Sequence, residues 1–229
     1  MKACSLVGLL VFCLLASSAA RAVESVSLVE DWTQQVVGAS GVPAGWKKYE
    51  TPGGRPVYDF TVVSDDGARG LRVRSRDEHS SIAKEVHVDL RATPILEWSW
   101  KVVKLPEGGD VRKKETSDLT GHVLVAWPRM PALLRTRLIG YVWEATAPAG
   151  TMERSRKTSL VTFFILHSGP AELGRWMVER RNVRDDYVRA FGEEPSSPGV
   201  VAISIDTNDT HSTAEAVIGR IAFIRDGTK

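Results

Sequence analysis

The 229-residue sequence has only two cysteines, a formal charge of just +2 and no long apolar run after its first residues. Cys4 and Cys13 both lie near the N-terminus, so the rest of the chain has no thiol for a disulfide, a cysteine–zinc site or a cysteine nucleophile. No later segment approaches the roughly 18 consecutive apolar residues of a membrane-spanning helix. The small charge argues against a protein that binds nucleic acids by neutralising phosphates.

The first 22 residues have the layout of a secretory signal peptide. Lys2 supplies a positive charge, residues 6–15 are mostly apolar, and Ala20-Arg21-Ala22 has the small-x-small pattern of a cleavage site. We therefore expect cleavage after Ala22, a mature domain over residues 23–229, and a periplasmic or secreted location. The mature chain would be formally neutral and would contain no cysteine.

Most of the mature sequence alternates apolar and polar residues, which is typical of half-buried strands. The clearest strand is residues 95–103, where Leu96, Trp98, Trp100 and Val102 share one face. Closely spaced strands with few helices predict a mainly β fold, a single antiparallel β-sandwich of the jelly-roll (galactose-binding-like) type.

Two local features are expected within this sandwich. A short helix is predicted near residues 183–191, with Asn182 as its N-cap and Gly192 at its end. Residues 200–206 and 215–225 are expected to pair as a terminal antiparallel hairpin, because a polar turn joins them.

That polar turn has two interpretations. Asp206, Asn208 and Asp209 offer three oxygen ligands within four residues, a set that suits Ca²⁺. The same residue types also stabilise a chain reversal by bonding to their own backbone, and the turn lacks the glycine of an EF-hand loop. We favour stabilisation of the turn and keep calcium binding as the weaker alternative. The sequence predicts no other cofactor.

Seven tryptophans in a neutral, exported β protein suggest stacking on sugar rings, because their flat apolar faces suit pyranoses. Four of them share strand faces with aliphatic residues and are assigned to the core. Trp32, Trp46 and Trp176 lie in less constrained positions. These three are the predicted stacking residues.

Motifs for catalysis are absent, and we name no catalytic residue: there is no phosphate-binding glycine loop, no nucleophile elbow and no HExxH. Two enzymatic arrangements stay open. Loop carboxylates, Asp118 among them, could act as in a glycosidase, and a lyase could use Tyr141, His122 and Arg180. Asp118, Tyr141 and Arg180 are therefore kept as ligand-binding candidates beside the three tryptophans.

Several segments are shared with a known family: Trp98-Ser99-Trp100-Lys101, Tyr141-Val142-Trp143, Glu179 to Tyr187, Ile203 to Thr210 and Gly219 to Phe223. Over residues 26–225 the chain resembles the DUF3047 family, bacterial exported proteins without an assigned function. The resemblance implies one jelly-roll sandwich similar to carbohydrate-binding modules, and it supplies no activity.

The polar turn departs from the pattern of that family. The family has Asp-Thr-Asp-Asn-Thr in the turn, whereas here Asn208 and Asp209 stand in the reverse order. Arg220 also replaces an acidic residue in the last strand. Both departures weaken the calcium interpretation.

The sequence thus favours an exported, non-catalytic β-sandwich that binds a carbohydrate or another cell-envelope ligand. It predicts no nucleic-acid partner and no membrane span after signal cleavage. One alternative is a polysaccharide-cleaving enzyme, either a lyase or a hydrolase. The other is a structural partner of an envelope complex, which predicts an exposed apolar patch of several hundred Å².

Overall fold

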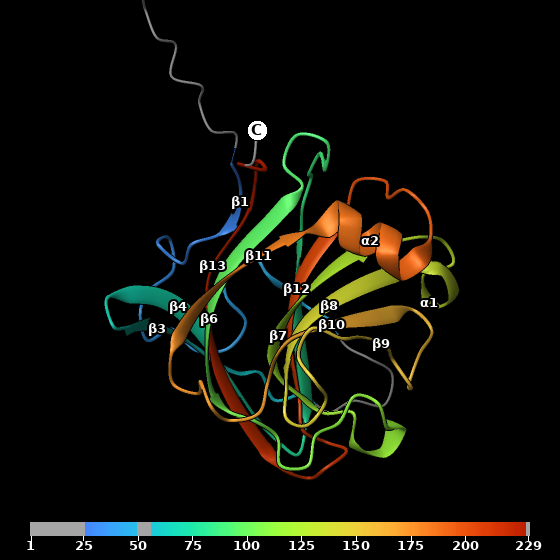
Figure 1. The fold of residues 1–229 in the computed structure, drawn as a ribbon. Coiled ribbons are helices and arrows are strands. Elements are labelled where there is room, and N and C mark those ends of the chain that lie inside the picture. The colour runs from blue at the N-terminus through green and yellow to red at the C-terminus, as the bar shows by residue number, and fades with distance from the viewer. Residues whose placement is uncertain (1–25, 50–55, 228–229) are drawn as a thin grey trace, which may run out of the picture.

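The computed structural model describes residues 26–49 and 56–227, and the predicted signal peptide lies outside them. Two β-sheets pack face to face (Figure 1), which confirms the predicted β-sandwich of jelly-roll type. The six-stranded sheet has the order β11-β6-β13-β4-β3, and β1 pairs with the end of β13. Its strands are β1 (Ser27–Glu30), β3 (Asp59–Asp65), β4 (Ala68–Arg76), β6 (Ile95–Lys104), β11 (Trp176–Asn182) and β13 (Thr213–Ile224).

The seven-stranded sheet has the order β2-β5-β12-β7-β8-β10-β9. It is antiparallel except between β8 and β10, which run parallel, contrary to the expectation of a purely antiparallel fold. The chain between these two strands, residues 145–160, returns to the start of β8 without a helix and contributes β9 on the way. The strands are β2 (Lys47–Lys48), β5 (His79–Glu85), β7 (Leu119–Trp127), β8 (Arg137–Glu144), β9 (Met152–Arg154), β10 (Val161–Ser168) and β12 (Val200–Asp206).

The last two strands do not pair with each other, so the predicted terminal hairpin was wrong. β12 lies between β5 and β7, whereas β13 is the central strand of the other sheet. Residues 207–212 carry the chain from one sheet to the other. Alternation in a sequence indicates which face of a strand is buried, but it does not indicate the sheet to which the strand belongs.

Large side chains at alternate strand positions fill the space between the sheets. Leu96, Trp98, Trp100 and Val102 of β6 are all buried, which confirms the predicted face. The rings of Trp98 and Tyr141, from opposite sheets, lie 5.1 Å apart. Burial of such apolar surface, worth about 25 cal/mol per Å², is the main force holding the two sheets together.

The predicted helix is present as α2 (Val183–Phe191). The Asn182 side chain accepts a hydrogen bond from a backbone N–H of the first turn, and Gly192 closes the helix with a φ of 73°. The structure adds a one-turn helix, α1 (Ala132–Arg135), and a 3₁₀ turn, η1 (Lys114–Thr116). Within residues 26–49 and 56–227, no helix has the length and hydrophobicity needed to span a bilayer.

Loops cover part of the outer face of the seven-stranded sheet. Glu144, the last residue of β8, is fully buried. Its carboxylate accepts hydrogen bonds from the backbone N–H groups of Val111, Thr146 and Ala147, at 2.8, 2.9 and 3.0 Å. These three bonds fix two loops against the sheet, and a small apolar cluster forms beneath them.

Candidate functional site

Hydrogen-bonding side chains gather on the outer face of the seven-stranded sheet. Ser204 of β12 lies in register between Ser81 of β5 and His122 of β7. The Oγ atoms of Ser81 and Ser204 share a hydrogen bond of 2.5 Å, and Nε2 of His79 lies 2.9 and 3.2 Å from them. Asp206 pairs with His79 at the next step along the strands. We call His79, Ser81, His122, Ser204 and Asp206 the polar row.

Both histidines of the polar row are held in the neutral form. His122 is buried, and burial lowers its pKa to about 4, although its Nδ1–H donates to the Thr120 carbonyl at 2.8 Å. Burial also lowers the pKa of His79, and the nearby ammonium of Lys157 lowers it further. At neutral pH the serines and histidines of the row therefore present uncharged donors and acceptors.

One end of the row is acidic and contains a lysine. Nζ of Lys157 lies 3.4 Å from Oδ2 of Asp206 and also contacts the Asp209 carboxylate. The Asp118 carboxylate accepts hydrogen bonds from the backbone N–H groups of Asp209 and Thr210, at 3.1 and 2.7 Å. The structure thus brings Asp118, Asp206 and Asp209 together, whereas Asn208 is exposed.

Asp206 is the most perturbed carboxyl group of this end. Burial raises the pKa of Asp206 to about 7, and the charges of Asp118 and Asp209 act in the same direction. The ammonium of Lys157 opposes this shift without cancelling it. Near neutral pH the Asp206 carboxyl can therefore hold a proton, unlike an ordinary aspartate.

Lys157 also bears on the calcium interpretation. Its ammonium contacts both Asp206 and Asp209, so the cation next to these two carboxylates belongs to the chain itself. In the part of the chain that the structure describes, no three His, Cys, Asp or Glu side chains are grouped so as to hold a metal.

An aromatic residue and small residues lie beside the polar row. Tyr49 follows β2 and donates its backbone N–H to the Ser81 carbonyl, and its side chain is 54% exposed. Alternation from Lys47, which pairs with Ala83, places Tyr49 on the outer face. Ala83 and Ala202 pair across β5 and β12 on this face. Their short side chains lie next to the polar row, in which Ser81, Ser204 and His122 are buried.

Trp32 and Trp46 are not on the surface, which corrects their prediction as stacking residues. Both are buried, with parallel rings 5.9 Å apart, and they pack against the main core. The Trp32 indole N–H donates to the Gly219 carbonyl at 2.8 Å. The segment around them has little regular strand structure, so no alternation could have indicated their burial.

The lyase-like set does not come together, so that hypothesis was wrong. Tyr141 is fully buried on the inner face, where its hydroxyl donates to the Asp186 carboxylate at 2.9 Å. His122 points to the opposite face of the same sheet. Arg180 lies on the other sheet and forms an ion pair with Glu97 at 2.7 Å.

Trp176 lies at a different place from the polar row. It begins β11, the edge strand of the six-stranded sheet, opposite Lys101 on the outer face of that sheet. It is partly exposed. Of the three predicted stacking tryptophans, it is the one that a ligand can reach.

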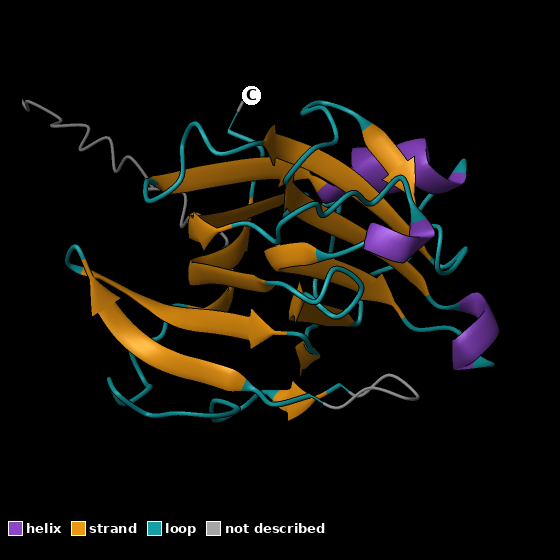
Figure 2. Ribbon diagram, turned by 90° about the horizontal axis from the view of Figure 1, so that it is seen from below, coloured by secondary structure: helices purple, strands orange, loops and turns teal. Residues whose placement is uncertain are grey.

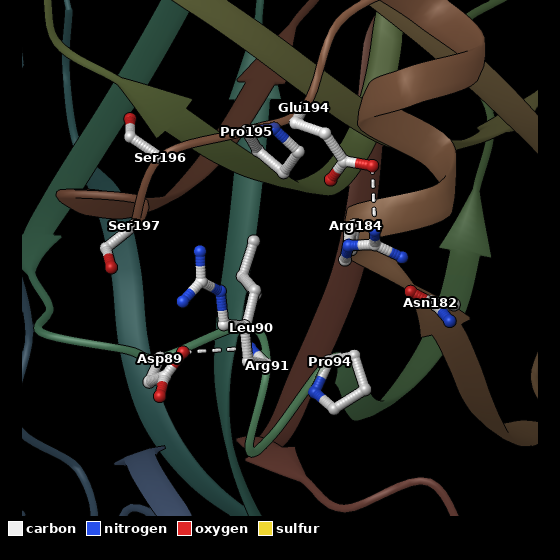
Figure 3. A pocket seen from close by; sticks show the side chains of 10 residues that line it. All are labelled: Asp89, Leu90, Arg91, Pro94, Asn182, Arg184, Glu194, Pro195, Ser196 and Ser197. Carbon is white, nitrogen blue, oxygen red and sulfur yellow. Dashed lines mark hydrogen bonds and ion pairs between the residues drawn. The ribbon is translucent and has the colours of Figure 1, made fainter.

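An open hollow of about 840 Å³ lies at one end of the sandwich, next to the start of α2 (Figure 3). An ion pair of 2.7 Å between Arg184 and Glu194 borders it, and Arg91 is among the residues that line it. The residues that line it include no aromatic side chain. The polar row has the exposed ring of Tyr49 beside it and contains the Asp206 carboxyl, whose pKa is raised, so we regard the row as the candidate site.

The chain belongs to a family with no assigned function. The family model described as "Protein of unknown function (DUF3047)" matches residues 44–222, which confirms the resemblance seen in the sequence. No curated protein matches the chain.

Several solved structures share the general arrangement of the chain. The family 11 carbohydrate-binding module of a Clostridium thermocellum cellulosomal cellulase has 9% identity and a TM-score of 0.45, and the match covers 89% of this chain and 96% of that one. A family 30 module from the same organism has 13% identity and a TM-score of 0.45, over 90% and 99%. The xyloglucanase domain of NopAA from Sinorhizobium fredii has 10% identity and a TM-score of 0.46, over 82% and 98%. At TM-scores below 0.5, these likenesses carry no inference about ligand or reaction.

Proposed function

We propose that this member of the DUF3047 family is an exported, non-catalytic binding protein for a carbohydrate or a similarly polar cell-envelope ligand. The ligand lies on the outer face of the seven-stranded sheet. The observation that carries the proposal is the polar row with the exposed ring of Tyr49 beside it.

The chemistry of the row suits sugar hydroxyl groups. Each hydroxyl both donates and accepts a hydrogen bond, and so do the serine hydroxyls and the neutral histidines of the row. The exposed ring of Tyr49 supplies an apolar face for the C–H groups of a sugar ring. Since the two histidines are neutral, the binding energy comes from oriented hydrogen bonds and stacking rather than from charge.

A periplasmic or secreted location is part of this proposal. It is supported by the charged start, the apolar stretch of residues 6–15 and the cleavage pattern that ends at Ala22. Expression of the full chain in a Gram-negative host, with N-terminal sequencing of the periplasmic fraction, tests it. Cytoplasmic accumulation of uncleaved protein would contradict it.

The binding site is tested with a polysaccharide panel, followed by calorimetry on the tightest ligand. Removing the ring in Y49A is expected to lower affinity about tenfold, since an aromatic contact of this kind contributes on the order of 1 kcal/mol or more. W176A, which removes the accessible tryptophan of the other sheet, is the matched control and should leave affinity unchanged. If W176A lost binding and Y49A did not, the ligand would lie on the six-stranded sheet and the assignment would fall.

Cleavage of the same ligand is a second candidate function, and Asp206 is the observation in its favour. A carboxyl with a pKa of about 7 can hold a proton near neutral pH and donate it to a leaving oxygen. Release of reducing ends from the bound polysaccharide, lost in D206N while binding persists, would establish cleavage. Binding without release by the unaltered protein would dismiss it.

A further inference from the structure

A second surface lies far in sequence from most of the polar row, in the connection between β7 and β8. Here the chain reads Met130-Pro131-Ala132-Leu133-Leu134, five apolar residues in succession. We call residues 130–134 the apolar tip. The Met130 side chain is 80% exposed and that of Leu134 75%, and Pro131 and Ala132 are exposed as well. Exposed apolar side chains that are grouped together indicate an interaction surface.

Three arginines flank the apolar tip. Arg129 precedes it, and Arg135 and Arg137 follow it. Arg129 and Arg137 share one carboxylate, that of Glu193, at 2.9 and 2.6 Å. The Arg135 guanidinium bonds only to the Met130 carbonyl, at 3.3 Å, among the described residues. With three arginines and one carboxylate, the immediate flank of the apolar tip has a net positive charge.

Contacts with α2 hold the flanking arginines in place. The Tyr187 hydroxyl accepts hydrogen bonds from Arg129 at 2.7 Å and from Arg137 at 3.0 Å. The Arg137 guanidinium also lies over the Phe191 ring, 4.8 Å from its centre. Arg129 and Arg137 therefore have fixed positions behind the tip, rather than sampling many arrangements in water.

The shape of this region distinguishes between classes of partner. Figure 2 shows α1, which carries much of the tip, extending beyond the ends of the strands at the lower right. A projecting apolar group with cations behind it matches a lipid interface. Apolar side chains enter between the acyl chains there, while guanidinium groups bind the phosphates above them.

We propose that the apolar tip docks the protein on a membrane surface that contains anionic phospholipids. Met130 and Leu134 insert at the headgroup level, and the exposed Arg135 binds lipid phosphates, with the charges of Arg129 and Arg137 behind it. The contact is peripheral and reversible, because it uses a single short loop. It is separate from the polar row, so a ligand and a membrane can be bound at the same time.

Vesicle co-sedimentation tests the proposal, with a chain that begins at Val23 and so contains every element of the sandwich. Binding is expected to vesicles of phosphatidylglycerol and phosphatidylcholine, to fall at high salt, and to be much weaker on phosphatidylcholine alone. M130S/L134S is expected to lower partitioning about tenfold, and R135Q about threefold. V36S/V37S alters two other exposed apolar residues and is the matched control, with no loss expected.

Three outcomes would overturn the proposal. The first is no binding to anionic vesicles by the unaltered protein. The second is equal loss of binding in M130S/L134S and V36S/V37S, which would mean that the tip has no special part. The third is a dimer that M130S/L134S dissociates, without vesicle binding, which would assign the tip to contact between two copies. Circular dichroism of each variant separates these outcomes from unfolding.

Discussion

The outer faces of the two sheets differ in how far their polar side chains are exposed and in how these side chains are paired. On the six-stranded sheet, Glu97 lies between Arg180 and Arg220, and its carboxylate contacts them at 2.7 and 2.8 Å, with much of both arginines in water. On the seven-stranded sheet, Ser81, Ser204 and His122 are buried. The first face has charges paired in solvent, whereas the middle of the second has buried, uncharged hydrogen-bonding groups, with Lys157 and carboxylates at one end.

This difference separates a solvated face from a candidate binding face. Ion pairs in water contribute little to stability. Polar groups that are withdrawn from water hold fixed directions and shift their pKa values, which is what a binding or catalytic site requires. Three predictions test how far the contrast holds.

The largest effect is expected at Glu144, whose carboxylate fixes the loops that cover part of the seven-stranded sheet. In E144Q an amide NH₂ would face backbone N–H groups that now donate to oxygen, leaving buried donors unpaired. We expect a loss of about 3 kcal/mol in the free energy of unfolding, measured by urea denaturation. A loss below about 1 kcal/mol would show that the loops stay in place without this carboxylate.

An intermediate effect is expected in the pH dependence of stability. The pKa of Asp206 is raised to about 7 in the folded protein, so the folded state holds a proton that the unfolded state loses above pH 4. The contribution of Asp206 to the free energy of unfolding therefore falls as pH rises from about 4 to about 7. The pKa of His122 is lowered to about 4, so its effect is opposite: stability falls as pH drops from about 6.5 to about 4.

These opposing trends can be separated by substitution. D206N should be stabilised relative to the unaltered protein by about 2 kcal/mol at pH 7.5 and by little at pH 4.5, since one pKa unit corresponds to about 1.4 kcal/mol and solvent reaches part of this carboxyl. H122N keeps a donor for the Thr120 carbonyl, and it should show declining stability from pH 4.5 to 7. Urea denaturation at four pH values measures both. Parallel pH profiles for the three proteins would show that neither group is perturbed.

The smallest effect is expected on the six-stranded sheet. E97Q removes the charge that two exposed arginines share, and we expect a loss below about 1 kcal/mol that disappears at high salt. The same urea measurement compares it with E144Q. A loss of unfolding free energy as large as that of E144Q would show that the polar groups of the two faces do not differ in their contribution to stability.

The sequence predicts the layers of the fold better than their connections. Alternation in residues 95–103 identifies the buried face of β6, and Asn182 and Gly192 mark the ends of α2, because these signals are local. The sheet in which β12 and β13 pair depends on contacts between distant segments. The parallel pairing of β8 with β10 depends on such contacts as well. Short-range sequence patterns therefore predict neither the sheet to which β12 and β13 belong nor the parallel pairing.

The sequence singles out the acidic part of the candidate site, and it singles out His122 only within a different set of residues. Asp206 and Asp209 stand out as a cluster in the sequence, and Asp118 appears as a loop carboxylate. Ser204 could have been found, because it lies two residues before Asp206 on the same strand face. Lys157 and Tyr49 lie outside regular strands, so only the folded chain shows that they reach this face.

The position of β13 has a consequence for how the chain folds. The last strand in the sequence is the central strand of the six-stranded sheet, and β1, the first strand, pairs with it through Ser27 and Phe223. The sheet therefore cannot close until β13 has been synthesised, and pairing between such distant segments is slow. A chain that we propose to be exported thus has β1 without its neighbour until β13 is present, which leaves time for translocation before folding.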